Sequence, residues 1–273
     1  GNTNNFGDLN VATDAAGATG SKTRMIYSGG AANPGNTRKA DIQYANFSTE
    51  GNFADFGDMT DEKRGMSSCG NNTRGLNFAG RDDPANLNII DYITIGTLGN
   101  AADFGDLSAV TNSGSSVSNN TRAFFAGGRP SSTSVNEIQY VTISTTGNTA
   151  DFGDLLSILE TQTRASSTTR ALYAGGSDTS GNTYNVIQYS TFATTGNATD
   201  FGDLTVAREQ IQDAGSSNTV RGVFGSGQTP TATNVMDFVT IASTGDATDF
   251  GDMVTRSYRP AAASNGHGGL VGG

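Results

Sequence analysis

The tripeptide Phe-Gly-Asp recurs six times in this chain of 273 residues. Successive copies are 48 to 50 residues apart, and they begin at Phe6, Phe56, Phe104, Phe152, Phe201 and Phe250. A period of this length is typical of repeat architectures, in which each unit is one supersecondary element packed against its neighbours. The repeat therefore predicts one domain over residues 1–273 rather than two unrelated ones.

Each unit has the same internal order. A run of small residues such as Ser113–Asn119 is followed by a short apolar run that ends in glycine, such as Ala171–Gly176. A polar loop, an alternating segment such as Ile138–Ile143 and a Gly-Asn or Gly-Asp turn then lead to the next Phe-Gly-Asp. Alternation with period two, β-branched residues and Gly/Asn punctuation indicate four short strands per unit, named a to d.

Four strands in every unit of this length predict an all-β fold, a β-propeller of about six four-stranded blades. The units cover 6–55, 56–103, 104–151, 152–200 and 201–249, with a partial last unit of 250–273 joined to 1–9. Strand a lies innermost and needs small side chains, whereas strands b and c carry the apolar residues that pack between blades. The phenylalanine of each Phe-Gly-Asp is expected to wedge between blades at the outer radius.

The last unit lacks a strand c, so its blade is expected to be composite or incomplete. The strand is either missing or supplied by another chain or by further sequence. Strand b of this unit is expected to end near Gly272-Gly273.

Charged residues also follow the repeat. The aspartates of Phe-Gly-Asp include Asp58, Asp106, Asp154, Asp203 and Asp252, and an arginine stands eighteen residues after the phenylalanine at Arg24, Arg74, Arg122 and Arg170. We expect these carboxylates to satisfy turn N–H groups or to pair with the arginine of strand b. In five motifs a second aspartate stands directly before the phenylalanine, and each such pair could instead bind calcium. No cofactor is expected, and calcium is left open.

Catalytic chemistry has few candidate residues. His267 is the only histidine and lies among glycines near the C-terminus, so nucleophilic triads lack a credible base. With Cys69 as the only cysteine, a typical zinc site is also excluded. A glycosidase needs two acids that break the repeat, but most aspartates obey it. No catalytic or metal-binding residue is predicted, and the chain is not expected to be an enzyme.

The overall charge constrains the partners. Sixteen basic and 26 acidic residues give a net charge of −10, which disfavours nucleic acid. No run of 18 apolar residues occurs, so no membrane insertion is expected.

The loops between strands b and c differ most from unit to unit. Variable loops on a rigid scaffold commonly carry recognition. The charged residues in them are the candidate contacts: Arg38, Arg81, Asp82, Asp83, Arg129 and Asp178.

Three positions in three of the units resemble the kelch repeat: a Gly-Gly pair after strand b, a tyrosine in strand c and an aromatic residue in strand d. The matching sets are Gly29-Gly30, Tyr44 and Phe56; Gly127-Gly128, Tyr140 and Phe152; and Gly175-Gly176, Tyr189 and Phe201. The chain departs from kelch repeats in having no tryptophan, where they usually have one. The resemblance implies a propeller and says little about function.

The stretch Tyr140–Asn148 before Asp151-Phe-Gly-Asp is also similar to Thr- and Gly-rich repeats of virion proteins, especially those of marine and cyanobacterial phages. This resemblance implies a tail, fibre or capsid-associated part. The expected function is a non-catalytic structural or adhesion module, in a virion or extracellular, whose partners are other assembly subunits, further copies of itself or a cell-surface glycan.

Two alternatives stay open. An intracellular kelch-type adaptor would bind a peptide, and a cytoplasmic location also fits the sequence. A carbohydrate-active enzyme would show an asymmetric pair of acids at the channel mouth.

Overall fold

The computed structural model describes residues 5–32, 34–210, 213–257 and 259–265. Their regular structure consists of strands in six antiparallel sheets, without helices, so the prediction of an all-β fold is confirmed. No helix in these ranges is long and apolar enough to span a membrane.

Five sheets follow the predicted order a-b-c-d. Strand d of each contains the Phe-Gly-Asp that opens the next sequence repeat, so from here a unit means the four strands of one sheet together with the d–a connection that precedes them. The first consists of β2 (Gly17–Gly20), β3 (Arg24–Ser28), β6 (Asp41–Asn46) and β7 (Ala54–Asp58). The second consists of β8 (Ser67–Gly70), β9 (Arg74–Phe78), β11 (Ala85–Thr94) and β12 (Ala102–Thr111), with β10 (Arg81–Asp82) added to β11. The third consists of β13 (Ser115–Ser118), β14 (Arg122–Ala126), β15 (Glu137–Thr142) and β16 (Ala150–Asp154).

The fourth sheet consists of β17 (Thr163–Ser166), β18 (Arg170–Ala174), β19 (Val186–Thr191) and β20 (Thr199–Asp203). The fifth consists of β21 (Gly215–Ser217), β22 (Arg221–Gly225), β23 (Thr233–Thr240) and β24 (Thr248–Ser257). A small sixth sheet joins β1 (Thr13–Asp14), β4 (Ala31–Ala32) and β5 (Thr37–Arg38).

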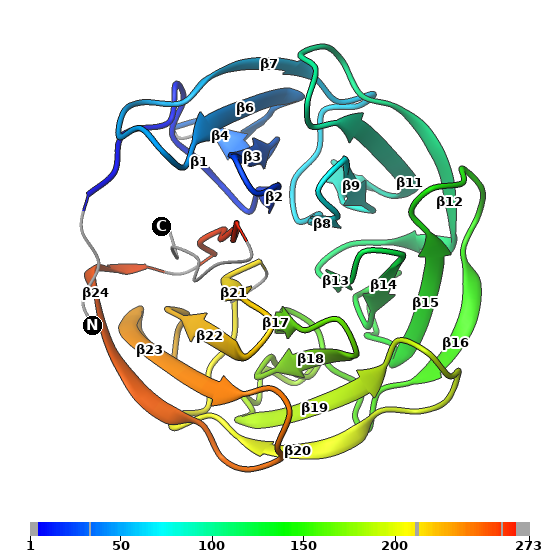
Figure 1. Ribbon diagram of the computed structural model, residues 1–273. Coiled ribbons are helices and arrows are strands. Elements are labelled where there is room, and N and C mark those ends of the chain that lie inside the picture. The colour runs from blue at the N-terminus through cyan, green and yellow to red at the C-terminus, as the bar shows by residue number, and fades with distance from the viewer. Residues whose placement is uncertain (1–4, 33, 211–212, 258, 266–273) are drawn as a thin grey trace.

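The five large sheets stand around a common centre (Figure 1). Their first strands β2, β8, β13, β17 and β21 lie innermost, and their last strands run along the outside. Converging strands leave little space for side chains, which explains inner sequences such as Ser67-Ser68-Cys69-Gly70. The prediction of small inner residues holds with two exceptions, Val117 in β13 and the much larger Arg164 in β17.

Apolar residues of strands b and c pack between neighbouring sheets, as predicted. Phe124, Ile138 and Phe152 of the third sheet form one cluster with Tyr173 and Phe192 of the fourth unit. Four phenylalanines of the Phe-Gly-Asp motifs are 2–3% exposed, namely Phe56, Phe104, Phe152 and Phe201. Their predicted position between sheets is therefore confirmed.

Phe-Gly-Asp and the Gly-Asn turn recur together because each motif of one unit binds the turn of the next. The carbonyl oxygen of Phe152 accepts a hydrogen bond from the Gly196 N–H (2.8 Å), and that of Asp154 accepts one from the Ala198 N–H (2.7 Å). The Asp154 N–H in turn donates to Asn197 Oδ1 at 3.1 Å. The same three bonds join the other successive sheets.

The glycine of the motif is required by this close approach. Gly153 has φ = 148°, and a Cβ there would lie 2.5 Å from the carbonyl carbon and oxygen of Gly196. Replacing Gly153 by alanine is therefore expected to reduce the free energy of unfolding by about 2 kcal/mol or more in urea denaturation. Gly96→Ala is the matched control, because a Cβ there meets no atom within 4 Å. Equal stability of the two variants would contradict this explanation.

The repeated arginine does not pair with the repeated aspartate, which corrects one of the two expectations for these residues. The Arg74 guanidinium lies 4.7 Å from the centroid of the Tyr92 ring, and its Nη1 donates to the Ile143 carbonyl oxygen of the next unit at 2.9 Å. The flat cation thus stacks on its own sheet and bonds to the following one. Equivalent contacts are made by Arg24, Arg122 and Arg170.

In two units the aspartate before the phenylalanine accepts a backbone N–H, as in the other expectation, but this N–H belongs to strand d rather than to a turn. Asp103 Oδ1 accepts a hydrogen bond from the Gly105 N–H, and Asp249 Oδ1 accepts one from the Gly251 N–H, each at 3.1 Å.

The residues predicted to form the last unit do not lie together in one sheet. Residues 250–257 lie in β24, the outermost strand of the fifth sheet, rather than in a sheet of their own. Of the remainder, the described residues 5–9 and 259–265 contain no strand. His267, Gly272 and Gly273 lie outside the described residues.

Residues 5–9 nonetheless keep the inter-unit contact. The Phe6 carbonyl oxygen accepts from the Gly51 N–H (3.0 Å), and the Asp8 carbonyl oxygen accepts from the Phe53 N–H (2.9 Å). The Asp8 N–H donates to Asn52 Oδ1 at 3.0 Å. This segment therefore contacts the first sheet as a strand d of a preceding unit would.

Candidate functional site

Three arginines gather around one aspartate where the b–c loops of the first two units meet. Arg38 ends β5, Arg81 begins β10, and Asp83 follows β10 directly. Both arginines form ion pairs with the Asp83 carboxylate. The structure thus brings together three of the six residues that the sequence indicated as contacts, and we call this group, with Arg64, the arginine cluster.

Arg64 completes the cluster from the connection between β7 and β8. Its backbone pairs with that of Arg81 through two hydrogen bonds of 2.8 and 3.2 Å. Its guanidinium donates to Asn36 Oδ1 at 2.8 Å and lies 3.4 Å from Asp83 Oδ2. The cluster is thereby fixed to the backbone of two neighbouring units.

The charge of the cluster is unbalanced. Three guanidinium groups face one carboxylate, in a protein whose net charge is −10. Partial burial, and after it the positive charge of Arg38, lower the pKa of Arg64. The side chains are 20–42% exposed, so they remain accessible to solvent. Such a group can accept a further anion, because a guanidinium presents paired donors that match carboxylate or sulfate oxygens.

The other predicted contacts lie outside the cluster or within their own loop. Arg129 is 3.5 Å from Glu160, whose carboxyl pKa is raised by burial. The Asp178 carboxylate accepts hydrogen bonds from the Asn182 side chain, the Tyr184 hydroxyl and two backbone N–H groups, which lower its pKa to about 2. Asp178 therefore organises its loop, and Asp82 is exposed at the end of β10.

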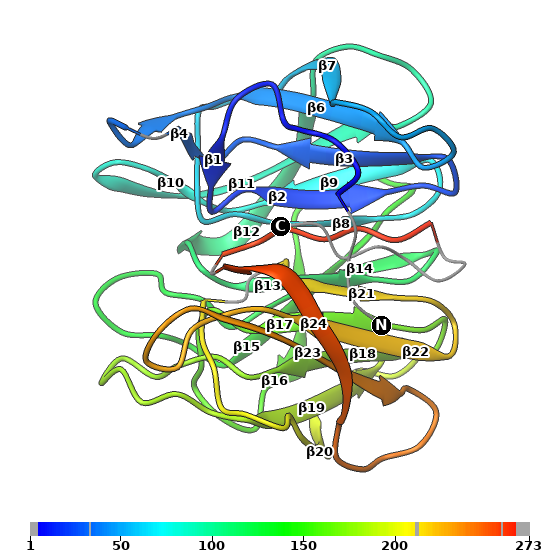
Figure 2. The ribbon, with the colours of Figure 1, turned by 90° about the vertical axis from the view of Figure 1, so that its left-hand side faces the viewer.

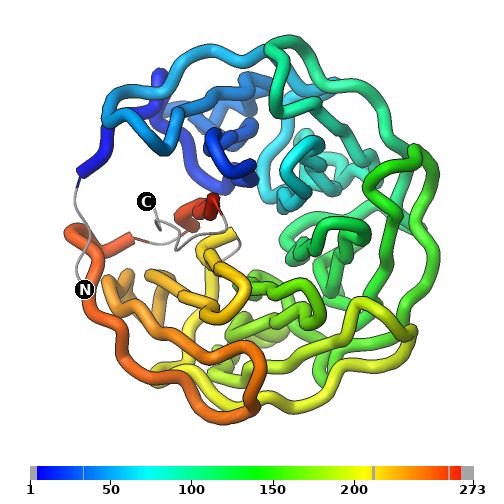
Figure 3. The backbone as a smooth tube through the Cα atoms, in the orientation of Figure 1, coloured from blue at the N-terminus to red at the C-terminus, as the bar shows by residue number. Residues whose placement is uncertain are grey.

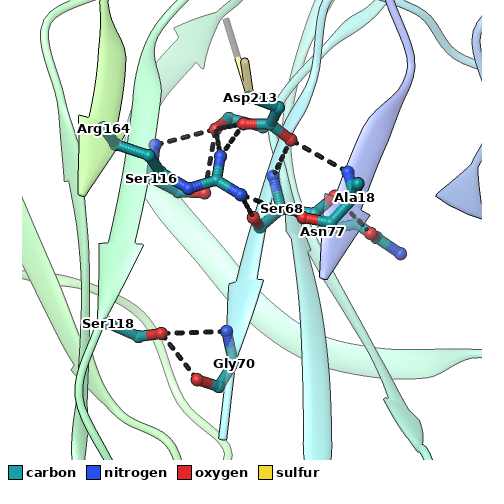
Figure 4. Close-up of polar contacts among 9 residues, drawn as sticks. Ala18, Ser68, Gly70, Asn77, Ser116, Ser118, Arg164 and Asp213 are labelled. Carbon is teal, nitrogen blue, oxygen red and sulfur yellow. Dashed lines mark hydrogen bonds and ion pairs between the residues drawn. The ribbon is translucent and has the colours of Figure 1, made fainter. Parts of the chain in front are cut away.

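A buried ion pair, Arg164 with Asp213, lies among the innermost strands (Figure 4). Arg164 Nη1 contacts Asp213 Oδ1, and both side chains are at most 8% exposed. Asp213 Oδ2 accepts the N–H groups of Ala18 (3.0 Å) and Ser68 (2.9 Å), and Arg164 Nη2 donates to the carbonyl oxygens of the same two residues.

The Ser67 hydroxyl extends the hydrogen bonds of the Arg164–Asp213 pair to the inner strand β13. Ser67 Oγ donates to Asp213 Oδ1 at 2.6 Å, and it accepts the Ser116 N–H at 2.8 Å. The pair thus connects the inner strands of the first three sheets with β17 and with the segment leading into β21. Because most of its polar atoms are satisfied, its role is structural.

An axial pocket of about 400 Å³ lies on the side of the a–b turns, with Arg164 among its lining residues. Serines in its wall form hydrogen bonds between neighbouring inner strands. For example, Ser118 Oγ accepts a hydrogen bond from the Gly70 N–H and donates one to the Gly70 carbonyl oxygen (Figure 4). Burial raises the pKa of the Cys69 thiol in the wall, which keeps it protonated. None of the described residues that line this pocket is acidic.

Two further buried ion pairs join strand c to the d–a connection. Lys63 Nζ lies 2.5 Å from Asp91 Oδ2, and Arg208 Nη2 lies 2.8 Å from Asp237 Oδ2. All four side chains are fully buried. The other units have glutamine in place of the aspartate, at Gln43, Gln139 and Gln188.

Units with a buried ion pair and units with glutamine differ in the hydrogen bonds of this strand c side chain. Each glutamine accepts the backbone N–H of the second residue after Phe-Gly-Asp, as Gln188 Oε1 does from Leu156 at 2.7 Å. The units with glutamine carry no cation seven residues after the phenylalanine; the fourth unit has Leu159 there. Lysine or arginine occurs at that position only in the two units with aspartate. A comparison of the units could therefore have found both pairs.

In the described part of the chain, no group of three or more His, Cys, Asp or Glu residues could hold a metal ion. No protein-family model matches this chain, and no curated protein sequence matches it significantly. The arginine cluster is therefore judged on its geometry alone.

Proposed function

We propose that this chain is a kelch-like β-propeller, with five complete blades and a composite sixth, that acts as a non-catalytic adhesion module of a virion or another extracellular assembly. The proposed ligand is an acidic glycan bound at the arginine cluster. The single observation that carries this proposal is the convergence of three arginines from variable b–c loops and the adjoining d–a connection around one aspartate.

The chemistry of the cluster favours a glycan over an apolar protein surface. The residues around the arginines are polar, among them Asn36, Thr37 and Asp82. Protein interfaces have apolar and aromatic cores, and none of the large exposed apolar side chains of the described residues belongs to these loops. Carboxylate and sulfate groups on a polysaccharide match spaced guanidinium donors.

Replacing both Arg38 and Arg81 by glutamine is expected to weaken binding of a sulfated oligosaccharide at least about tenfold, since hydrogen bonds to charged groups contribute about 1.5–3 kcal/mol. Affinity would be measured by calorimetry, after an array of neutral and acidic glycans has identified a binder. Stability should change little, because exposed ion pairs contribute about 0–1 kcal/mol.

Arg129→Gln is the matched control, because Arg129 lies in a b–c loop outside the cluster. Preference for neutral glycans, or equal affinity of all variants, would contradict the proposal. Binding of acidic peptides but of no glycan would instead favour the intracellular adaptor. Ordered oligomers in light scattering and negative-stain images would support a role in an assembly.

A further inference from the structure

Lys63 and Asp91 bring an amine and a carboxyl group together inside the second unit. The connection between β7 and β8 carries Lys63 inwards between the first and second sheets (Figure 3). The b–c loops lie at one end of the sheets, where Figure 2 shows β4 and β10 (left). The Lys63 N–H donates to the Lys39 carbonyl oxygen of the first of these loops (3.3 Å), and the Lys63 carbonyl oxygen accepts the Gly30 N–H (3.0 Å). The backbone that carries the amine is thus held in place.

The amine and the carboxyl group are in contact and shielded from water. Lys63 Nζ lies 2.5 Å from Asp91 Oδ2, and neither side chain is accessible to solvent. In the described part of the chain neither atom has a hydrogen-bond partner, and the angles of their own contact are not those of a hydrogen bond. Within these residues no third group therefore competes with the carboxyl group for the amine.

The Thr60 hydroxyl contacts the other oxygen of the same carboxyl group. It donates to Asp91 Oδ1, and it comes from the same connection as Lys63. A donor at this oxygen stabilises the negative charge that develops there when a nucleophile adds to the carboxyl carbon. One segment of the chain thus supplies both a nucleophile and a hydrogen-bond donor to Asp91.

The fifth unit has the same surroundings with a different cation. Thr205 Oγ1 donates to Asp237 Oδ1 at 2.5 Å, and Arg208 Nη2 lies 2.8 Å from Asp237 Oδ2. A guanidinium stays protonated in proteins, whereas a lysine amine can lose its proton and act as a nucleophile. Of these two buried pairs, the one in the second unit is therefore the pair that can react.

We infer that Lys63 and Asp91 condense to an isopeptide bond, an amide between Lys63 Nζ and Asp91 Cγ. The ion pair is the state before the reaction. One proton passes from Nζ to Oδ2, which leaves a neutral amine and a neutral carboxylic acid. Nζ then attacks Cγ while the Thr60 hydroxyl stabilises the charge on Oδ1. A second proton passes from Nζ to Oδ2, the Cγ–Oδ2 bond breaks, and one water molecule leaves, so no oxidant or cofactor is consumed.

Two properties of the site favour this reaction. The fold holds the amine against the carboxyl group, which replaces an encounter in solution by a step within one molecule. Condensation also removes two charges from a place where their desolvation is costly. The amide would join the connection that carries Arg64 covalently to strand c of the second sheet, and it would thereby fix the backbone on one side of the arginine cluster.

The mass of the intact chain tests the inference. The purified folded chain should weigh one water molecule less than its sequence requires. After proteolysis, tandem mass spectrometry should show the peptide with Lys63 joined to the peptide with Asp91. Lys63→Arg should have the full mass of its sequence. This variant is expected to fold, because the fifth unit buries an arginine beside an aspartate at the equivalent positions.

Lys22→Arg is the matched control, because Lys22 is exposed in an a–b turn, and it should lose one water molecule as the wild type does. A wild-type chain that folds with the full mass of its sequence would overturn the inference. A water loss that persists in Lys63→Arg would also overturn it, because the loss would then arise elsewhere in the chain.

Discussion

Replacing Lys63 by leucine is expected to reduce the free energy of unfolding by about 3–5 kcal/mol, because it leaves the buried Asp91 carboxylate without its ion partner. Both side chains of the pair are inaccessible to solvent. The remaining contact of the carboxylate from the d–a connection is the Thr60 hydroxyl. One hydroxyl donor does not compensate for a desolvated charge.

The fourth unit supplies the compensating change. It combines Leu159 with Gln188 at the positions of Lys63 and Asp91, and the glutamine accepts a backbone N–H. Lys63→Leu combined with Asp91→Gln should therefore recover most of the lost stability, although the two substitutions are each destabilising alone. A double-mutant cycle in urea measures this coupling. If the stability losses of Lys63→Leu and Asp91→Gln simply added in the double variant, the Lys-Asp pair and the Leu-Gln combination would not be interchangeable, which would contradict this account.

Arg164→Ser is the second substitution with a large expected effect, again about 3–5 kcal/mol. Serine fits the strand, since Ser68 and Ser116 occupy the equivalent positions of the second and third units. Stability is lost because the buried Asp213 carboxylate keeps its charge but loses its guanidinium partner. Urea denaturation measures this loss in the free energy of unfolding.

The double variant Arg164→Ser with Asp213→Ala should be more stable than Arg164→Ser alone, because it removes the uncompensated charge. Ala16 shows that alanine fits the position of Asp213 in the first unit. A loss below about 1 kcal/mol for Arg164→Ser would be inconsistent with a structural role of the pair.

The local periodicity of the sequence was sufficient to predict strands a to d of the five large sheets, but not the short strands β1, β4, β5 and β10, and the described residues 5–9 and 259–265 of the last predicted unit contain no strand. Alternation and glycine punctuation fix each strand within its own unit, and the interval between Phe-Gly-Asp motifs fixes the order of the units. Small residues in the innermost strands are predicted from the convergence of these strands on a common centre alone. These features depend on neighbours in the sequence or on the symmetry of the repeat.

Contacts between units explain what the sequence did not predict. Pairing of the repeated arginine with an aspartate was one of two expectations, but the partner of this arginine is a backbone carbonyl of the next unit, which carries no sequence signal. Arg164 finds Asp213 across 49 residues, and Asp213 follows a d–a connection two residues longer than in the other units.

The candidate site was predicted in part for the same reason. Loop variability indicated Arg38, Arg81 and Asp83, but Arg64 lies in a connection that was not considered for recognition. The ion pairs that join these residues depend on how two loops meet in space, which no single unit encodes.

The most direct test of the proposed function is to observe the arginine side chains during a titration with a sulfated oligosaccharide. Nitrogen-15 NMR resolves the Nε–Hε group of each arginine. We predict saturable shifts at Arg38, Arg64 and Arg81, and unchanged signals at Arg129 and at the stacked Arg74. Shifts confined to the residues of the axial pocket, or no shifts at any arginine, would contradict the proposal that the arginine cluster is the binding site.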